Sequence, residues 1–383
     1  MNIKKLIEFR KELHQYPELS NREEGTAQKI IEKLEEYKPA KIIEGIGGYG
    51  VAAIYDSGRP GKNILFRAEL DALPINESNK FSHKSKKDGI AHKCGHDGHM
   101  TILIGLAQIL QKQIKNLKGK IILLFQPAEE TAEGALRILA EKKFRNLKSD
   151  FIFALHNLPG FPLNSVILRK GVFASASKGL IIDLKGETSH AGFPENGYNP
   201  DLALSFIISG LLAIPQKFTN FNSANLITII KAELGERAFG TSAGKARIMA
   251  TLRSHSKADM QILTRQSEKL VESIANLYNL KHKLEWVEEF APIINHAECV
   301  DLIKMISKKL KLKIVEPQKP FPWSEDFSFY TKEFPCTFFG LGSGEKYSQL
   351  HNSNYDFPDD IIETGIKLFL EIAKNNQQIN SLC

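Results

Sequence analysis

Five side chains that can bind a metal ion are crowded into one short segment, HKCGHDGH at residues 92–99: His92, Cys94, His96, Asp97 and His99. Thiolate and imidazole ligands suit zinc, and imidazole combined with carboxylate also suits manganese, cobalt or nickel. A polar loop rich in histidine would have the same composition. The segment therefore predicts a metal site only if further ligands come from elsewhere in the chain.

Further candidate groups follow runs of apolar residues that are typical of buried strands. ILFRAEL runs into Asp71, IILLFQPA runs into Glu129 and Glu130, and FIFAL runs into His156. In open α/β sheets, ligands and catalytic groups collect beyond the carboxyl ends of the strands. We therefore expect these groups to meet the segment 92–99 at one edge of a sheet.

The elements that position these groups alternate along the first 175 residues. Strand-like runs occur at KNILFRAEL, KIILLFQ and DFIFALH, and HMTILIGLAQILQKQ between the first two has an apolar helical face. We expect that helix to begin near Met100. The alternation favours an α/β fold with a largely parallel sheet, and continuous apolar strands fit a sheet that is buried on both faces.

Residues 178–288 follow a different order. Strand, helix, strand, strand, helix and strand patterns occur in turn, which is the split ferredoxin-like β-α-β-β-α-β unit. We therefore expect an inserted domain at 178–288 and a metal-binding domain made of 1–177 and 289–383.

Taken one at a time, the candidate residues also have ordinary explanations. A single histidine after a buried strand, such as His156, is more often a hydrogen-bonded core residue. An adjacent pair of glutamates is usually a solvated face, and the segments around His190 and His351 resemble a turn and a polar loop. Together they favour metal chemistry, because one glutamate of the pair can bind a metal while the other acts as general base on a metal-bound water.

Composition and charge exclude several classes. The formal charge of +7 is spread over interleaved Lys and Glu without a dense basic run, so nucleic-acid binding is not expected. The four cysteines are too widely spaced for a disulfide framework: Cys94, Cys299, Cys336 and Cys383. The N-terminus lacks a signal peptide pattern, and the longest apolar run, LALSFIISGLLAI, is too short for a membrane span. We expect a cytoplasmic protein.

The chain resembles the amidohydrolase branch of the M20 metallopeptidases, which includes aminoacylase-like, hippurate-hydrolase-like and auxin-conjugate-hydrolase-like enzymes. The resemblance covers nearly the whole chain, with motifs in the family's order: RKELHQYPELSNRE, FRAELDALPI, HKCGHDGHM, FQPAEE, ALHNLPGFP, SHAGFPENG, WSEDFSFY and LHNSN. It implies a zinc-peptidase-like catalytic domain with a ferredoxin-like satellite domain, and a homodimer formed through that satellite domain.

The resemblance also implies two divalent ions per subunit (Zn, Mn, Co or Ni) and a role for each matching residue. Glu129 falls on the general base, Asp71 on a supporting aspartate, and His190 on a histidine that polarises the substrate carbonyl, often from the other subunit. His92 and His99 belong to the motif but are not assigned as ligands. The positions that match metal ligands are Cys94, His96, Glu130, His156 and His351.

Two departures from the family pattern stand out. Glu69 replaces an aspartate in FRAELDALPI, and we expect little consequence from this exchange. FGTSAG, at residues 239–244, stands where many members carry an asparagine-containing segment, which bears on substrate recognition. A substrate carboxylate would need a cation, and the candidates are Arg253 and Arg237, with Arg247 as a third.

The sequence therefore predicts a metal-dependent amidohydrolase that acts on N-acyl amino acids, which are small molecules. A small-peptide peptidase or an N-acetyl-diaminopimelate deacetylase of the same family is the alternative. Two other classes stay open: a non-catalytic metal-binding dimer, and a thiol enzyme with Cys94 as nucleophile.

Overall fold

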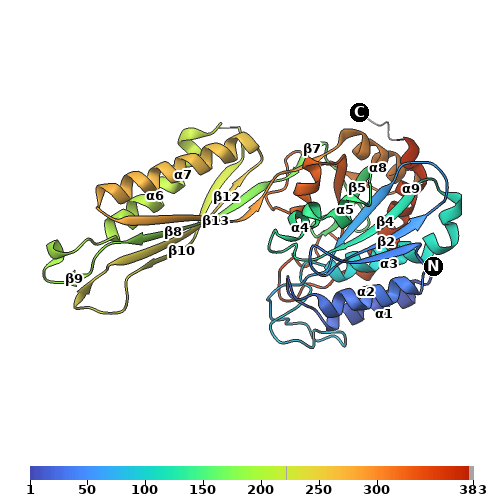
Figure 1. Ribbon diagram of the computed structural model, residues 1–383, viewed down its shortest axis with the longest axis horizontal. Helices are drawn as coiled ribbons and strands as arrows, with labels where there is room; N and C mark the ends of the chain where they lie inside the picture. The colour runs from blue at the N-terminus through green and yellow to red at the C-terminus, as the bar shows by residue number, and fades with distance from the viewer. Residues whose placement is uncertain (221, 379–383) are drawn as a thin grey trace. The chain divides into compact units, whose positions relative to one another are not determined.

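The computed structural model describes residues 1–220 and 222–378, so that Cys383 lies outside the described part of the chain. The chain forms two compact units, and each has a hydrophobic core of its own (Figure 1). Unit 1 comprises Met1–Phe173, Ile293–Lys319 and the chain from Glu325 onward, and unit 2 comprises Ala174–Pro292 and Pro320–Ser324.

An eight-stranded sheet forms the centre of unit 1, in the order β1-β2-β4-β3-β5-β16-β6-β15. Strands β4, β3, β5 and β16 run parallel in its middle, while β1 and β2 form an antiparallel edge. This confirms the predicted α/β class with a mainly parallel central sheet. The strands are β1 (Lys41–Ile46), β2 (Gly50–Asp56), β3 (Ile64–Glu69), β4 (Lys120–Gln126), β5 (Phe151–Leu158), β6 (Val166–Ile167), β15 (Ile314–Val315) and β16 (Cys336–Gly342), and a separate short ladder joins β7 (Gly171–Ala174) to β14 (Ile293–Asn295).

Five helices contribute apolar side chains to the core of unit 1: α1 (Ile3–Gln15), α2 (Glu24–Glu35), α3 (His96–Gln113), α8 (Ala297–Lys309) and α9 (Ile362–Asn375). Ile64, Phe66 and Ala68 of β3 join this core. Since successive strand residues point to opposite faces, Arg67 and Glu69 lie on the other face of the sheet. Shorter helices complete the unit: α4 (Gly134–Ala140), α5 (Lys142–Arg145) and the 3-10 segments Ile114–Asn116, Asp326–Lys332, Asp359–Ile361 and Asn376–Gln378.

Helix α3 begins at His96, four residues earlier than the predicted start near Met100. The residue before it, Gly95, has a φ of 95°, in the left-handed region that favours glycine. A Cβ atom at this position would also collide with the side chain of Asn157. The close approach of Gly95 to Asn157 therefore fixes where the helix starts, and it places His96 in the first turn of α3.

Unit 2 contains a four-stranded antiparallel sheet in the order β10-β12-β8-β13. Figure 1 shows helices α6 and α7 on one face of this sheet, and the core of the unit lies between the helices and the strands. The elements are β8 (Ala176–Lys185), β9 (Ser189–His190), the 3-10 segment Pro194–Asn196, α6 (Asp201–Phe218), β10 (Asn225–Leu234), β11 (Thr241–Ser242), β12 (Lys245–Ser254), α7 (Lys257–Leu277) and β13 (Lys281–Phe290).

Helix α6 is the one helix among the described residues that is long and apolar enough to cross a membrane by length and composition. The apolar run counted in the sequence is shorter than the helix, which spans 18 residues. Ala203, Ile207, Leu211 and Ile214 form a stripe at helical spacing that is buried in the core of unit 2. The buried face of α6 therefore packs in the core of unit 2.

Candidate metal centre

The predicted ligands of the first ion lie together in unit 1. Donor atoms of Cys94, His96 and His156 all lie within 4.8 Å of one another, and Cys94 Sγ is 3.3 Å from His156 Nε2. Cys94 belongs to the loop before α3, His96 to the first turn of α3, and His156 to the buried strand β5. Three separate stretches of backbone therefore aim a thiol and two imidazoles at one point.

A second group shares the thiol of Cys94 with two further predicted ligands. Donor atoms of Cys94, Glu130 and His351 lie within 4.8 Å of one another, and so do those of His96, Glu129 and Glu130. Because Cys94 belongs to two of these groups, the five predicted ligands form two neighbouring clusters that share its thiol. Glu129, the predicted general base, lies beside them.

The hydrogen bonds of two histidines fix which ring nitrogen faces the centre. His96 Nδ1 lies 2.9 Å from the backbone carbonyl of Asp71, and His156 Nδ1 lies 2.9 Å from the carbonyl of Asn157. A carbonyl oxygen can only accept, so Nδ1 carries the proton in both rings. In the neutral form of each ring, Nε2 then has the lone pair, which is the arrangement of a metal-ligating histidine.

The two glutamates are presented by a tight turn after β4. Ala128 has a φ of 51°, and its N–H donates to Glu23 Oε1 at 2.8 Å. The N–H of Glu130 donates to Asp71 Oδ2 at 3.0 Å, and Ser20 Oγ donates to the same oxygen at 2.7 Å. The fully buried Asp71 therefore supports both a ligand histidine and the turn that carries Glu130.

The electrostatics of the centre reflect an excess of buried negative charge. Burial and neighbouring carboxylates raise the pKa of Glu129 well above its usual value. Burial and Asp71 raise the pKa of Glu130 to about 7, although His96 opposes the shift. Burial lowers the pKa of His96, but Asp71 and Glu69 outweigh it and raise the pKa to about 10. The raised pKa values mean that protons compensate the negative charge of the buried carboxylates. A bound metal cation would compensate the same charge.

Arg67 supports the centre from the sheet face that it shares with Glu69, and the sequence analysis missed it. Its fully buried guanidinium donates to Glu325 Oε1 at 2.9 Å and to Asp326 Oδ1 at 2.6 Å, and it pairs with Glu69. Glu69 Oε2 in turn contacts His99 Nδ1 at 2.6 Å. The carboxylate of Glu69 therefore joins Arg67 to the metal-binding helix. The small expected consequence of having glutamate in place of aspartate stays a prediction.

A second buried network lies behind the loop that carries Cys94. His14 of α1 contacts Asp97 Oδ2 at 2.8 Å and Glu77 Oε1 at 3.0 Å, and Arg10 also pairs with Asp97. Burial lowers the pKa of His14, but its hydrogen bonds to these two carboxylates outweigh burial and raise the pKa to about 9. The sequence signal was present in RKELHQYPE, where Arg10 and His14 share a face of an amphipathic helix.

The remaining predicted residues lie in unit 2. His190 is exposed on the two-residue ladder between β9 and β11, where it pairs with Thr241. Arg253 Nη1 donates to the backbone carbonyl of Pro322 at 2.9 Å, so it serves the fold of unit 2. Arg237 is exposed.

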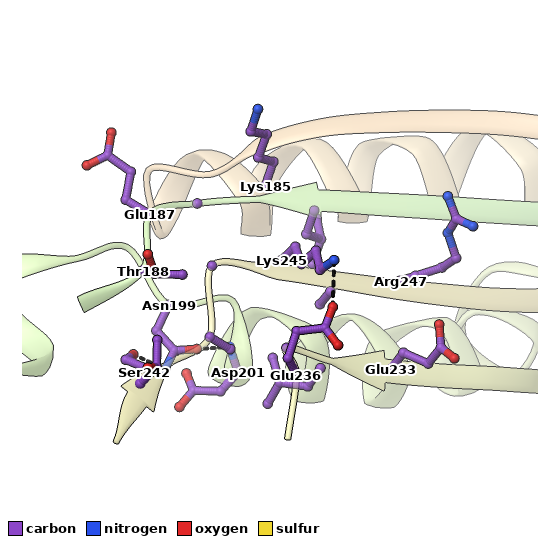
Figure 2. A pocket seen from close by; sticks show the side chains of 18 of the residues that line it. Lys185, Glu187, Thr188, Asn199, Asp201, Glu233, Glu236, Ser242, Lys245 and Arg247 are labelled. Carbon is purple, nitrogen blue, oxygen red and sulfur yellow. Dashed lines mark hydrogen bonds and ion pairs between the residues drawn. The ribbon is translucent and has the colours of Figure 1, made fainter. Parts of the chain in front are cut away.

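A cavity of about 1300 Å³ lies at the end of the unit 2 sheet where Thr241 and Ser242 of β11 are found (Figure 2). Its charged lining is largely paired. Arg247 forms two hydrogen bonds with Asp183. Figure 2 shows the pair of Lys245 and Glu236, in which Nζ lies 2.8 Å from Oε1. None of the predicted metal ligands lines it. The donor atoms of the predicted metal ligands converge in unit 1, away from this cavity.

Comparison with known proteins identifies the family of the chain. The model of the peptidase family M20/M25/M40 matches residues 65–375, which is most of the chain. The chain belongs to this family. The matched range contains the whole cluster of donor atoms described above.

Named relatives of this M20 chain are hydrolases. It is 32% identical to the N-acetyl-L-cysteine deacetylase of Bacillus subtilis, over 91% of this chain and 82% of the relative. It is 30% identical to the hippurate hydrolase of Campylobacter jejuni, over 95% and 94%. Among solved structures, the YXEP protein of Bacillus subtilis, described as a dinuclear metal-binding peptidase of the M20 family, matches with a TM-score of 0.84 at 27% identity, over 99% of both chains. The chain is therefore an M20 hydrolase.

Proposed function

We propose that this chain is a metal-dependent amidohydrolase that cleaves the amide bond of N-acyl amino acids. The observation that carries the proposal is the convergence of five ligand side chains beside Glu129: Cys94, His96, Glu130, His156 and His351. The deacetylase and hippurate hydrolase names of its relatives support the choice of an N-acyl substrate. The runner-up is a small-peptide peptidase or an N-acetyl-diaminopimelate deacetylase, and the first of these has support from the described activity of the YXEP protein.

The donor set fits a pair of divalent cations. Thiolate, imidazole and carboxylate together suit zinc, manganese, cobalt or nickel. His96 Nε2 and Glu130 Oε1 are buried and have no hydrogen-bond partner among the described residues, which is costly unless another group binds them. Cys94 and His156 would hold one ion together with His96, and Cys94 and His351 would hold the other together with Glu130.

The proposed reaction is hydrolysis by an activated water. The ligand side chains would hold two cations, and the chemistry supplied by such cations when bound would be a water of lowered pKa and a polarised substrate carbonyl. Glu129, which lies beside the ligands His96 and Glu130, would accept the proton of the attacking water and then deliver it to the leaving amine. His190 donates a hydrogen bond to the oxyanion that forms on the carbonyl. Asp71 holds His96 and the backbone of Glu130 in place throughout.

The substrate carboxylate needs a cation. Of the predicted arginines, Arg253 is committed to the carbonyl of Pro322 and Arg247 to Asp183. Arg237 is exposed and close in sequence to the segment FGTSAG, so it is the better candidate for this role. Replacing Arg237 by alanine should raise KM for N-acyl amino acids more than for their amides.

Unit 2 is proposed to be the satellite domain through which the chain forms a homodimer. The outer face of α6 and the edge strand β10 expose large apolar side chains, which is unusual for a free surface. Four of them are Leu202, Phe206, Leu226 and Ile230, each half or more exposed. Phe206→Asp together with Ile230→Asp should convert a dimer into a monomer in light scattering. A wild-type monomer would contradict this part of the proposal.

The proposed compartment is the cytoplasm, since Cys94 can ligate a metal only as a reduced thiolate. The other two described cysteines, Cys299 and Cys336, are also free and buried.

The test is a hydrolysis screen with purified protein loaded with manganese or zinc. N-acetyl and N-benzoyl amino acids should be cleaved faster than dipeptides, and a chelator should abolish the activity until metal is restored. Activity that survives the chelator would favour a thiol enzyme with Cys94 as nucleophile. A protein that binds metal but cleaves no amide would favour a non-catalytic metal-binding dimer. Alkylation of Cys94 should remove metal and activity together, and full activity after alkylation would exclude Cys94 as a ligand.

A further inference from the structure

Lys93 carries a fully buried ammonium group directly beside the metal-binding loop. Its Nζ donates to Glu77 Oε1 at 2.5 Å, to Asn79 Oδ1 at 2.9 Å and to the backbone carbonyl of Tyr355 at 2.6 Å. These three acceptors satisfy the three donors of an ammonium group. Burying a lysine is costly, and the three acceptors offset that cost. The question is what a buried ammonium group does in the loop next to Cys94.

The acceptors of Lys93 lie on two different segments, and one of them carries a predicted ligand. Tyr355 follows His351 by four residues, and the N–H of His351 donates to the backbone carbonyl of Lys93 at 2.8 Å. His351 has a φ of 66°, so its backbone conformation is one that most residues avoid. Lys93 therefore holds the segment 351–355 at both ends, through its own carbonyl and through its ammonium group.

The segment 77–79 completes this arrangement. Asn79 Nδ2 donates to the carbonyl of Asn354 at 2.9 Å, and the N–H of Ser78 donates to the carbonyl of Ser353 at 3.0 Å. The ammonium group of Lys93 joins these two segments from the buried side. Without it, the backbone carbonyl of Tyr355 would lose its buried partner, and the Tyr355 hydroxyl would keep its bond from Asn157.

The ligands of the other ion are anchored differently. His156 lies in β5, which pairs with β16 along its length, and His96 lies in the first turn of α3. Their Nδ1 atoms contact the backbone carbonyls of Asp71 and Asn157, and the side chain of Asn157 donates to the hydroxyl of Tyr355. The regular structure of β5 and α3 therefore holds this pair of ligands.

We infer that Lys93 is a positioning residue that holds His351 against Cys94 and so sets the affinity of the ion bound by Cys94, Glu130 and His351. The ion bound by Cys94, His96 and His156 depends much less on it. This inference rests on the metal centre of the proposed function. Outer residues that orient metal ligands change metal affinity by about 10–100-fold when they are replaced.

The experiment compares wild type with Lys93→Met in crystals and in solution. Site-resolved occupancy from cobalt anomalous diffraction at limiting Co²⁺, and dissociation constants from competition with a chelator, are measured for both proteins. In Lys93→Met the site with His351 should lose about 10–100-fold in affinity, while the site with His156 should stay close to its wild-type value. Lys87→Met, an exposed lysine nearby that lies 3.4 Å from Glu18, is the matched control and should leave both sites unchanged.

A second variant guards against a folding defect. Asn79→Ala removes one acceptor of Lys93 and one bond to the segment 351–355 without leaving a buried charge alone, and it should weaken the same site by a smaller factor. Equal weakening of both sites in the variants, or no weakening of either, would overturn the role of Lys93. A wild-type protein that binds no cobalt at these ligands would instead overturn the proposed function.

Discussion

The two units present their predicted functional groups in opposite ways. In unit 1, His96 and Asp71 are fully buried, and each is bonded to other groups of the same unit. In unit 2, His190 is exposed on a ladder only two residues long. Unit 1 is therefore built to hold charges at fixed positions, as a metal centre requires. In unit 2, by contrast, the side chain of His190 is accessible from outside the core of the unit.

The same contrast holds for the arginines of the two units. Arg67 of unit 1 is fully buried among three carboxylates, whereas Arg247 of unit 2 pairs with Asp183 on an exposed surface. A buried pair that loses one partner leaves an uncompensated charge, but an exposed pair is well solvated. The comparison indicates that the stability of the protein is far more sensitive to charges in unit 1.

The largest expected effect concerns the general base. Glu129→Gln should lower kcat by a factor of about 10²–10⁴, because the amide cannot take the proton of the water. Metal content should stay at the wild-type level, since Glu129 is not one of the five assigned ligands. Steady-state kinetics with parallel metal analysis measures both. Near-full kcat with metal bound would remove Glu129 from this role.

The next effect concerns stability and compares the two arginines. Arg67→Met should destabilise the protein by about 3–5 kcal/mol, because Glu69, Glu325 and Asp326 lose their common partner in the interior. Arg247→Met should leave the free energy of unfolding close to the wild-type value, because its pair with Asp183 is exposed to solvent. Urea unfolding of both variants measures the difference. An equal loss of unfolding free energy in the two variants would mean that the burial of Arg67 does not make its ion pairs more important for stability than those of Arg247.

A third effect addresses the exposed histidine of unit 2. His190→Ala should lower kcat by about 10²–10³, since a hydrogen bond to the oxyanion is lost. Mixing inactive His190→Ala and Glu129→Gln subunits should then restore part of the activity if the site is shared between two chains. Mixed dimers without any recovery would place both residues of a site in one chain.

The smallest effect concerns the pH dependence of stability. The pKa of His14 is raised from its usual 6.5 to about 9. The protonated ring therefore stabilises the fold below pH 6.5, and this contribution of up to about 3 kcal/mol is lost as the pH rises to about 9. Tm of the wild type should fall more than Tm of His14→Gln over this range. Parallel curves for the two proteins would show that His14 does not carry a proton in the folded state.

Much of unit 1 could be predicted from the sequence, because it follows from short-range patterns. Apolar runs identified β3, β4 and β5, and the polar groups after them marked the edge where ligands collect. The start of α3 was missed, since the left-handed conformation of Gly95 depends on contact with Asn157, some 60 residues away in the sequence. Long-range approaches of this kind leave no local pattern.

The buried ion pairs were missed for a related reason. Arg67 lies in the middle of the apolar run ILFRAEL, and nothing nearby in the sequence shows that Glu325 and Asp326 meet it. The sequence analysis likewise gave no role to Lys93. A charged residue inside an otherwise buried strand is the one signal that would have pointed to Arg67, because such a charge needs partners from elsewhere.

In the proposed centre two cations would share Cys94, and anomalous diffraction from crystals grown with Mn²⁺ or Zn²⁺ tests this most directly. We expect two peaks, one bound by Cys94, His96 and His156 and one bound by Cys94, Glu130 and His351. Full metal loading of the protein with peaks elsewhere, or with none of these five side chains as ligands, would contradict the account.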